Sequence, residues 1–209
     1  MPFVKKIETG IGTLGIWKLS ESVSDLVSFF QFSDKEKEEF SKIKSNRRKT
    51  EYLSVRLLLK ALLNQNPEIR YLKSGKPELI NSEKNISISH SSDFAVVFLS
   101  KYKIGIDIED TQRNIDKVAT RFLHKEEMKH IQNLNDPQTA SILYWSAKEA
   151  IFKCSNESGI QFNKQIFITN FEIKKEDQFT GKLTARQITS KYKLWYLFYE
   201  NNVIVYCVE

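Results

Sequence analysis

The chain has 209 residues, enough for one large domain or two small ones. Hydrophobic residues make up 41% of it, and with only seven Gly and four Pro the composition excludes a disordered or linker-rich protein. The 32 Lys and Arg outnumber the 26 Asp and Glu, and the net charge of +6 favours an anionic partner: nucleic acid, anionic lipid, a phosphorylated ligand or an acidic protein.

The use of cysteine and histidine, together with the hydropathy pattern, indicates the cellular setting. Cys154 and Cys207 form no CxxC pair, and three histidines are too few for a plausible zinc site. No apolar run approaches the roughly 18–20 residues that span a bilayer. The first 20 residues lack the long apolar core of a signal peptide. We therefore expect a cytoplasmic protein that does not contact a membrane.

The first half of the chain combines strand and helix patterns. Ser33 and Glu36 form a capping box that starts a helix. A second helix is expected from Asn46 to Leu63, because its apolar residues recur at helical spacing. Residues 72–80 contain glycine and proline and are expected to form a loop. The expected strands of this half cover residues 11–19, 85–89 and 94–100.

The second half repeats this mixture. A strand-like segment is expected over residues 103–109, and helical stretches follow near 114–133. Asp136 and Pro137 supply an N-cap and a first-turn proline for a long helix that should end near Gly159. The expected strands of the tail cover residues 167–173, 193–199 and 203–208.

Each half therefore reads as helices followed by a small antiparallel sheet. This order predicts an α+β fold with two similar packed subdomains, a pseudo-dimer within one chain, and an active site in the cleft between them. We place the subdomains at residues 1–102 and 103–209, because no linker separates the halves apart from a tight turn at 101–103.

Two carboxylates on the predicted strand 103–109 are candidates for a metal site. Asp107 and Glu109 are two residues apart, so their side chains leave the same face, while Ile106 and Ile108 point the other way into a core. Two adjacent carboxylates repel each other unless a cation lies between them, and Mg²⁺ suits such oxygen ligands. Removing the repelled Asp107 should then cost the fold little. The alternative is a solvated sheet edge.

The segment WSAKEAIFK (145–153) places Ser146, Glu149 and Lys153 on one face of the long predicted helix. Glu149 would supply a third carboxylate, and Lys153 a cation for a phosphoryl group. Carboxylates that bind a metal, with a lysine nearby, are expected in phosphoryl or phosphopantetheinyl transfer. The alternative is an ordinary surface ion pair, because Glu149 and Lys153 are four residues apart in the favourable order.

Two shorter motifs point to phosphate recognition. His90 lies at the end of a predicted strand between Ser89 and Ser91, where it could hydrogen-bond a phosphate. The alternative is that it is a turn or core residue. Lys76 lies in a Gly-Lys-Pro loop, which places a cation on a rigid turn. Neither motif is specific alone.

In this order and spacing the motifs resemble the Sfp-type 4′-phosphopantetheinyl transferase family. The resemblance covers roughly residues 33–175. Its motifs are GKP (75–77), ISISHS (86–91), IGIDIE (104–109), RF (121–122) and WSAKEAIFK (145–153). It implies an Mg²⁺-dependent enzyme, with Mn²⁺ as a possible substitute. Such an enzyme moves the phosphopantetheine arm of coenzyme A (CoA) onto a serine of an apo acyl or peptidyl carrier protein and releases 3′,5′-ADP.

The resemblance also implies roles for the residues of the second half. Asp107, Glu109 and Glu149 become the metal ligands. Glu149 is in addition the candidate general base for the carrier serine. Lys153 would steady the pyrophosphate and help the leaving group. The second half would thus hold the metal ligands and the catalytic helix.

The first half would make most contacts with the CoA nucleotide. The residues implied to bind CoA are Arg47, Lys76, Ser89, His90, Asp107 and Lys153. Ser89 and His90 would contact phosphates, whereas Lys76 and either Arg47 or its neighbour Arg48 would hold the nucleotide end with its 3′-phosphate. Arg47 is the preferred assignment.

Other protein classes explain less of the sequence. A Mg²⁺-dependent phosphodiesterase or nucleotidyl transferase would share the carboxylates but would not require the SHS and GKP motifs. A nucleic-acid-binding module is disfavoured, because Asp107 and Glu109 would repel a phosphate backbone unless a metal intervened. The short acyl-carrier synthase type forms trimers from a chain about half as long, whereas the duplicated layout here predicts a monomer.

Basic charge should attract the carrier protein, and Phe122 and Leu123 are candidates for an apolar contact with it.

Overall fold

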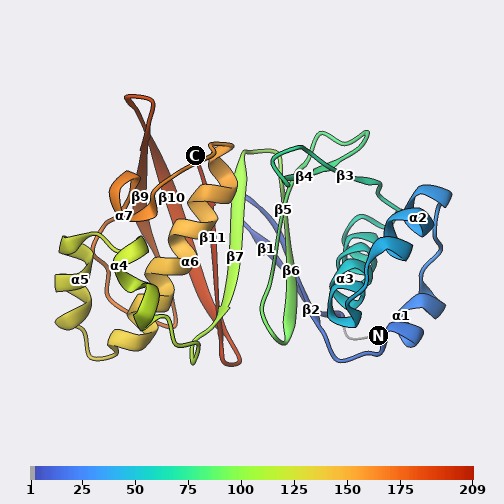
Figure 1. Cartoon of the computed structure of the whole chain (residues 1–209), viewed down its shortest axis with the longest axis horizontal. Coiled ribbons are helices and arrows are strands. Elements are labelled where there is room, and N and C mark those ends of the chain that lie inside the picture. The colour runs from blue at the N-terminus through green and yellow to red at the C-terminus, as the bar shows by residue number, and fades with distance from the viewer. Residues whose placement is uncertain (1–2) are drawn as a thin grey trace.

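The computed structural model describes the backbone of residues 3–209 and the side chains of residues 5–209. Two antiparallel sheets lie face to face in the middle of the molecule, and a long helix covers the outer face of each (Figure 1). The layers are therefore helix, sheet, sheet and helix. The α+β fold class predicted from the sequence is confirmed.

The first sheet contains four strands in the order β1-β2-β6-β5. These strands are β1 (Phe3–Thr9), β2 (Gly12–Lys18), β5 (Asn85–His90) and β6 (Phe94–Ser100). Helix α3 (Asn46–Leu63) packs against this sheet through an apolar cluster that includes Leu53, Leu58 and Val97. The observed bounds of α3 and β6 match the sequence predictions, because both segments carry an uninterrupted apolar pattern.

Two short helices and a small hairpin complete the first half. They are α1 (Val23–Phe29), α2 (Asp34–Lys42), β3 (Ile69–Tyr71) and β4 (Pro77–Leu79). The capping box predicted at Ser33 and Glu36 is present. The prediction of a loop over residues 72–80 is wrong at its end, because β4 pairs with β3 around a turn at Gly75.

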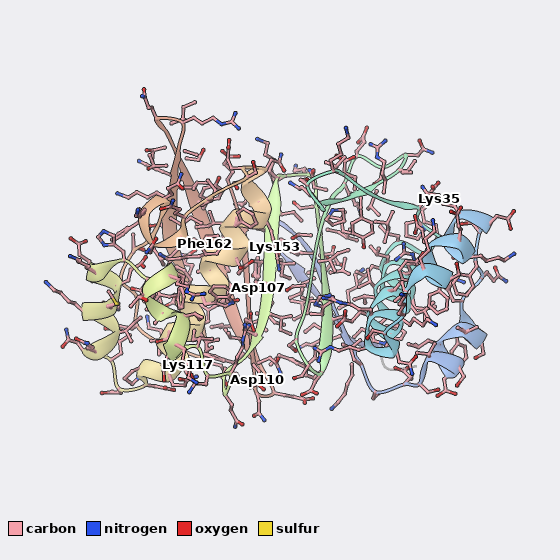
Figure 2. All side chains as sticks on the ribbon, viewed as in Figure 1. Lys35, Asp107, Asp110, Lys117, Lys153 and Phe162 are labelled. Carbon is pink, nitrogen blue, oxygen red and sulfur yellow. The ribbon has the colours of Figure 1, made fainter. Side chains whose placement is uncertain are left out.

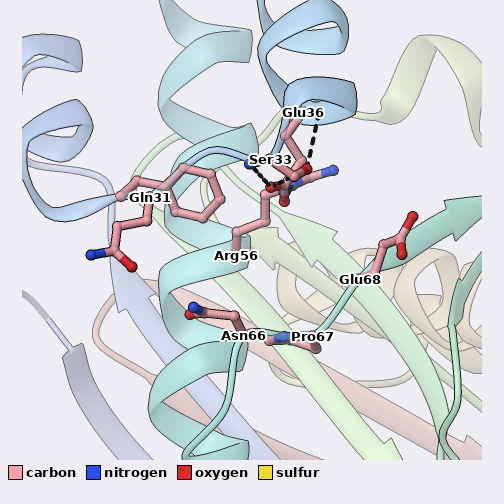
Figure 3. Close-up of a pocket in the computed structure, with 8 residues that line it drawn as sticks. Gln31, Ser33, Glu36, Arg56, Asn66, Pro67 and Glu68 are labelled. Atoms are coloured by element: carbon pink, nitrogen blue, oxygen red, sulfur yellow. Dashed lines mark hydrogen bonds and ion pairs between the residues drawn. The ribbon is translucent and has the colours of Figure 1, made fainter.

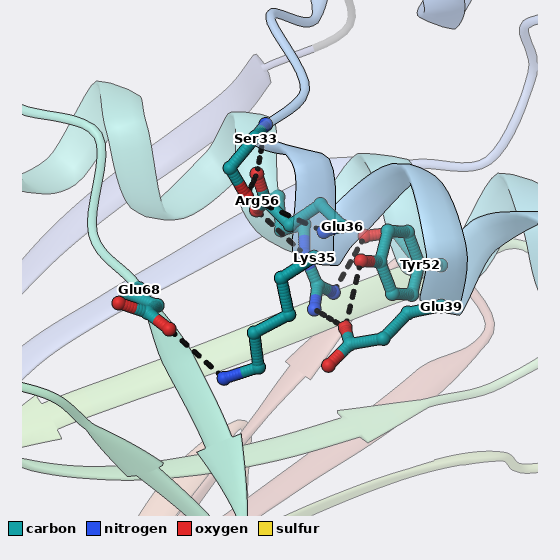
Figure 4. A network of polar contacts seen from close by, with 7 residues as sticks. All are labelled: Ser33, Lys35, Glu36, Glu39, Tyr52, Arg56 and Glu68. Carbon is teal, nitrogen blue, oxygen red and sulfur yellow. Dashed lines mark hydrogen bonds and ion pairs between the residues drawn. The ribbon is translucent and has the colours of Figure 1, made fainter.

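Helix α2 is fastened to α3 by an arginine inside the fold. Arg56 is almost fully buried and donates to the carboxylates of Glu36 at 3.3 Å and Glu39 at 3.4 Å (Figure 4). Its guanidinium also stacks on Tyr52, 3.3 Å from the ring centroid. A hollow of about 280 Å³ opens beside it (Figure 3), but Glu36 and Glu68 line the same space and make it unsuitable for an anion. This arrangement stabilises the helix that carries the arginines discussed below.

The second sheet contains five strands in the order β7-β11-β10-β9-β8. They are β7 (Ile104–Asp110), β8 (Ile166–Ile168), β9 (Glu176–Ala185), β10 (Ile188–Tyr199) and β11 (Asn202–Val208). The helical segments of this half are η1 (Asp116–Val118), α4 (Ala119–Phe122), α5 (Lys125–Gln132), α6 (Pro137–Ser155) and α7 (Phe162–Gln165). Helix α6 packs on the face of this sheet that is turned away from the first sheet.

Several sequence predictions for element bounds are wrong. Helix α6 ends at Ser155, four residues before the predicted end, because Asn156 adopts a left-handed conformation (φ 59°) that stops the helix. The strand predicted over residues 167–173 ends at Ile168. Strand β9 was not predicted, because it begins with the polar residues Glu176, Asp177 and Gln178 and contains Gly181, which disfavour a strand. The order of helices followed by a sheet is also wrong for the first half, which begins with the β1–β2 hairpin.

The two sheets meet through a shared apolar cluster. Ile104, Ile106 and Ile108 of β7 pack there against Ile16 and Phe98 of the first sheet. The prediction that Ile106 and Ile108 point into a core is therefore confirmed. The pseudo-dimer relationship and the boundary between residues 102 and 103 stay predictions. No helix in the described part of the chain is long and apolar enough to cross a membrane.

Candidate functional site

The candidate site lies where α6 crosses β7. A Cβ atom on Gly105 would lie 1.9 Å from the carbonyl oxygen of Ala150, so glycine is needed for α6 to approach the strand this closely. Asp107, two residues along, leaves the same face of β7. The approach brings Asp107 into contact with Ser146 and Lys153 of α6. Figure 2 labels Asp107 and Lys153 close to each other at this crossing.

Asp107 is buried and accepts three hydrogen bonds. Ser89 Oγ and Lys153 Nζ donate to its Oδ1 atom at 2.8 Å and 2.7 Å, and Ser146 Oγ donates to Oδ2 at 2.9 Å. Asp107 is therefore a paired carboxylate, and the expectation that its removal would cost the fold little neglects these partners. Its removal would leave two hydroxyl groups and the partly buried ammonium group of Lys153 without this acceptor, which destabilises a fold.

Lys153 is held from three sides. In addition to Asp107, its ammonium donates to Ser89 Oγ at 2.9 Å and to the carbonyl oxygen of Ile106 at 3.0 Å. About a quarter of its side chain, 27%, stays exposed. Lys153 is thus a fixed positive charge that still faces an opening, and it is no surface ion pair with Glu149.

Glu109 is the second carboxylate of β7. It accepts a hydrogen bond from Arg113 Nη1 at 2.6 Å and another from the indole Nε1 of Trp145 at 2.7 Å. Burial and the charge of Asp107 raise the pKa of Glu109, whereas the hydrogen bonds from Arg113 and Trp145 lower it. Sequence reasoning missed Arg113, which lies in the loop after β7 without a helical or strand pattern.

Glu149 has a different environment. Burial, followed by the charges of Asp107 and Glu109, raises its pKa to about 7, and Lys153 only partly opposes this effect. Among residues 5–209, no side chain donates a hydrogen bond to the Glu149 carboxylate. A carboxyl group with this pKa exchanges a proton near neutral pH, as a general base must.

The predicted metal ligands are electrostatic neighbours, but they do not converge. Across the described residues, no group of three His, Cys, Asp or Glu side chains is arranged to hold a metal ion. Lys153 occupies an oxygen of Asp107, and Arg113 occupies one of Glu109. The donor chemistry of three carboxylates fits Mg²⁺, which prefers oxygen ligands. A bound cation would have to displace or share these two ion pairs.

Three of the residues expected to bind CoA, Arg47, Arg48 and His90, form a second cluster around Glu51. This carboxylate is 5% exposed and accepts hydrogen bonds from Arg47 Nε at 3.1 Å and Arg48 Nη1 at 2.8 Å. His90 Nε2 lies 3.3 Å from it, and Arg47 also donates to the carbonyl oxygen of Ser91 at 3.3 Å. Sequence reasoning missed Glu51, although its spacing of three and four residues from the arginines is the signal for such a pair on a helix.

Lys76 does not lie in this cluster. It lines a hollow of about 180 Å³ between the Gly-Lys-Pro loop, β5 and the end of α6, together with Lys153. A second hollow of about 350 Å³ is lined by Arg48 and His90. Ile88 of β5 lines both hollows, so they adjoin. The structure therefore places Lys76 beside Lys153 and separates it from Arg47.

The comparison with known proteins decides the family. Residues 103–207 match the family model described as the 4′-phosphopantetheinyl transferase superfamily. The protein belongs to this superfamily. The matched region contains β7, α6 and all of the second sheet except Val208, and therefore the candidate carboxylates and Lys153.

Two curated relatives of this superfamily member support the assignment. The 4′-phosphopantetheinyl transferase gsp of Aneurinibacillus migulanus is 30% identical over 92 residues, which are 43% of this chain and 38% of that protein. A Haemophilus influenzae protein provisionally given the same activity is 32% identical over 99 residues, 44% of this chain and 41% of that protein. The matched stretches thus span less than half the length of these relatives. The family recognised from the sequence motifs is confirmed.

Two residues considered for contact with a carrier protein belong instead to the interior of this superfamily member. Phe122 and Leu123 are 1% and 4% exposed and pack in the cluster under α6, so the suggestion of an apolar docking contact there is wrong. The carbonyl oxygen of Phe122 accepts a hydrogen bond from the ammonium group of Lys148 at 2.8 Å, which joins α4 to α6. These side chains stabilise the helix that carries the site.

Proposed function

We propose that the protein transfers the 4′-phosphopantetheine arm of CoA to a serine of an apo acyl or peptidyl carrier protein and releases 3′,5′-ADP. The observation that carries this proposal is the group formed by Asp107, Glu149 and Lys153 at the crossing of α6 and β7. It combines a fixed ammonium with a carboxyl group of pKa about 7, beside a hollow that a second lysine lines. Membership of the superfamily supports the same reaction.

The reaction requires one bond to form and one to break. The carrier serine oxygen forms a bond with the phosphorus that bears the pantetheine arm. The bond from this phosphorus to the bridging oxygen of the pyrophosphate breaks, and 3′,5′-ADP leaves with the electron pair. Glu149 accepts the serine proton, a task for which a pKa near 7 is suitable.

Lys153 stabilises the charge that develops on the leaving group. Its ammonium is already held by Asp107, Ser89 and the Ile106 carbonyl group, so little reorganisation is needed when the reaction starts. Bound Mg²⁺, or Mn²⁺ in its place, would be held by Asp107, Glu109 and Glu149 and would neutralise charge on the pyrophosphate.

The nucleotide of CoA would be bound by the first half of the chain. Lys76 lines one of the two adjoining hollows, and His90 lines the other together with Arg48 of α3. Ser89 would contribute through its hydrogen bond with Lys153, which lines the first hollow. Residues 1–102 would thus supply the nucleotide contacts, and residues 103–209 the metal ligands and catalytic helix. We propose that the enzyme acts as a monomer and binds no nucleic acid.

Intact-mass spectrometry tests the proposal directly. An apo carrier protein is incubated with CoA, Mg²⁺ and the enzyme, and the expected result is a mass gain of one phosphopantetheine. Two controls identify the reaction: a carrier whose modified serine is replaced by alanine, and a sample with EDTA. If CoA is cleaved while fatty-acid, polyketide and peptide carriers all keep their mass, the protein is a phosphodiesterase and the proposal is wrong.

A further inference from the structure

The residue that ends α6 connects the two halves of the site. Asn156 has φ 59° and ψ 8°, the left-handed conformation that follows many helices and that glycine adopts most readily. Asparagine tolerates this conformation and, unlike glycine, brings a side chain to it. Here its Oδ1 atom accepts a hydrogen bond from the ammonium group of Lys76, which belongs to the Gly-Lys-Pro loop of the other half.

Lys76 needs this partner because it is partly buried. Burial lowers the pKa of its ammonium, and nearby Lys103 lowers it further. Among the described residues, no carboxylate forms an ion pair with Lys76. Asn156 therefore satisfies a donor of the ammonium group without neutralising its charge. A carboxylate at this position would hold Lys76 equally well but would cancel the charge that an anion needs.

The position of the pair indicates which anion benefits. Lys76 and Asn156 both line the hollow of about 180 Å³ that also contains Lys153. Both also line a neighbouring hollow of about 350 Å³. Two lysines thus line one space, and this arrangement suits an anion with several charges.

We infer that Asn156 is a positioning residue that holds the Lys76 ammonium in place for a phosphate group of CoA. The inference rests on the proposed function, since it concerns the same site. Asn156 itself does not need to touch CoA. Its contribution is to fix a flexible lysine before the ligand arrives, so that less side-chain entropy is lost on binding.

The Asn156→Gly variant separates this role from a structural one. Glycine adopts the backbone conformation of residue 156 without strain, so the melting temperature should stay the same or rise. The KM for CoA should increase roughly five- to tenfold, the scale of one lost charge-assisted contact, with kcat changed less than about twofold. The Kd for CoA, measured by calorimetry without a carrier protein, should increase by the same factor.

The chain offers a matched control. Asn64 ends α3 in the same left-handed conformation (φ 54°, ψ 30°), and no hydrogen bond joins its side chain to Lys76 within the described residues. The Asn64→Gly variant should therefore resemble Asn156→Gly in melting temperature and keep the CoA affinity of the wild type. An equal loss of affinity in both variants would overturn the inference.

A second test asks whether Asn156 acts through Lys76. In a Lys76→Met background, Asn156→Gly should change the Kd for CoA by less than about twofold, because the interaction it supports is already lost. Fully additive effects would overturn the inference, and so would an unchanged Kd in Asn156→Gly alone. If the wild-type protein binds CoA but modifies no carrier, the proposed function fails while the calorimetric test of Asn156 still stands.

Discussion

Helix α6 carries two ion pairs that have the same length and different environments. Lys148 Nζ lies 2.7 Å from Glu127, and Lys153 Nζ lies 2.7 Å from Asp107. Lys148 and Glu127 are both fully buried, whereas Lys153 keeps 27% of its side chain exposed. The first pair is closed to solvent and ligands, and the second faces a hollow.

The other hydrogen bonds of the two lysines explain the difference. Lys148 also donates to the carbonyl oxygens of Phe122, Phe162 and Ile166, at 2.8, 3.2 and 2.7 Å, and so ties α6 to three segments that surround it. Lys153 donates to Asp107 and to the Ile106 carbonyl oxygen of its own half, and to Ser89 Oγ of the other sheet. Lysines five residues apart differ by about 140° around a helix, which is enough to turn one into the core and the other toward the site.

The largest effect is expected for the buried pair. Replacing Lys148 with alanine leaves Glu127 charged and unpaired in the interior, so the free energy of unfolding should fall by about 3–5 kcal/mol. Urea denaturation measures this change. The Lys153→Ala variant is the matched control and should lose clearly less stability. Similar losses in both variants would remove the distinction between the pairs.

The second effect concerns turnover. Lys153→Ala should lower kcat by roughly 10²-fold, the scale for losing one charge-stabilising group at a reacting centre. Glu149→Gln should be at least as damaging, because it removes a candidate base and a metal ligand. Steady-state kinetics with a carrier protein measures both, and alanine at the exposed Lys129 controls for net charge. Unchanged turnover in both variants would restore the interpretation of a simple surface pair.

The third effect links the site to stability. The pKa of Glu149 is raised from an ordinary 4.5 to about 7, so its ionisation destabilises the folded protein increasingly as the pH rises from 4.5 to 7. Gln cannot ionise. In EDTA, Glu149→Gln should therefore be more stable than the wild type by about 1–2 kcal/mol at pH 8, after allowance for partial exposure, and this gain should vanish near pH 4. Thermal unfolding at the two pH values checks the prediction, and equal stability at pH 8 would contradict it.

The smallest effect is expected for the two arginines that donate hydrogen bonds to Glu51, which should differ in their contribution to CoA binding. Arg48 lines the hollow next to His90, whereas Arg47 is also bound to the Ser91 carbonyl group. Arg48→Ala should therefore lose more of the preference for CoA over dephospho-CoA than Arg47→Ala, by a few-fold in the ratio of Kd values. Calorimetry with both ligands measures this ratio. A larger loss in Arg47→Ala would support the original assignment to Arg47.

Much of the local structure could be predicted from the sequence because it depends on neighbours along the chain. The capping box at Ser33 requires only residues 33–36, and the bounds of α3 follow from an apolar pattern with helical spacing. Because side chains point alternately to the two faces of a strand, the sequence of β7 also places its carboxylates on one face and its isoleucines on the other. The motifs around Asp107 and Lys153 were sufficient to identify the family.

Only the tertiary structure decided what each charge contacts. Asp107 is bound to Ser89 and Lys153, which lie 18 and 46 residues away in the chain, so nothing in its neighbourhood reveals that it is already paired. Lys148 and Lys153 stand in one nine-residue motif, and only burial by distant segments assigns one to the core and the other to the site. A charge acts through its surroundings in space, because burial and Coulomb interactions depend on distance and not on position in the sequence.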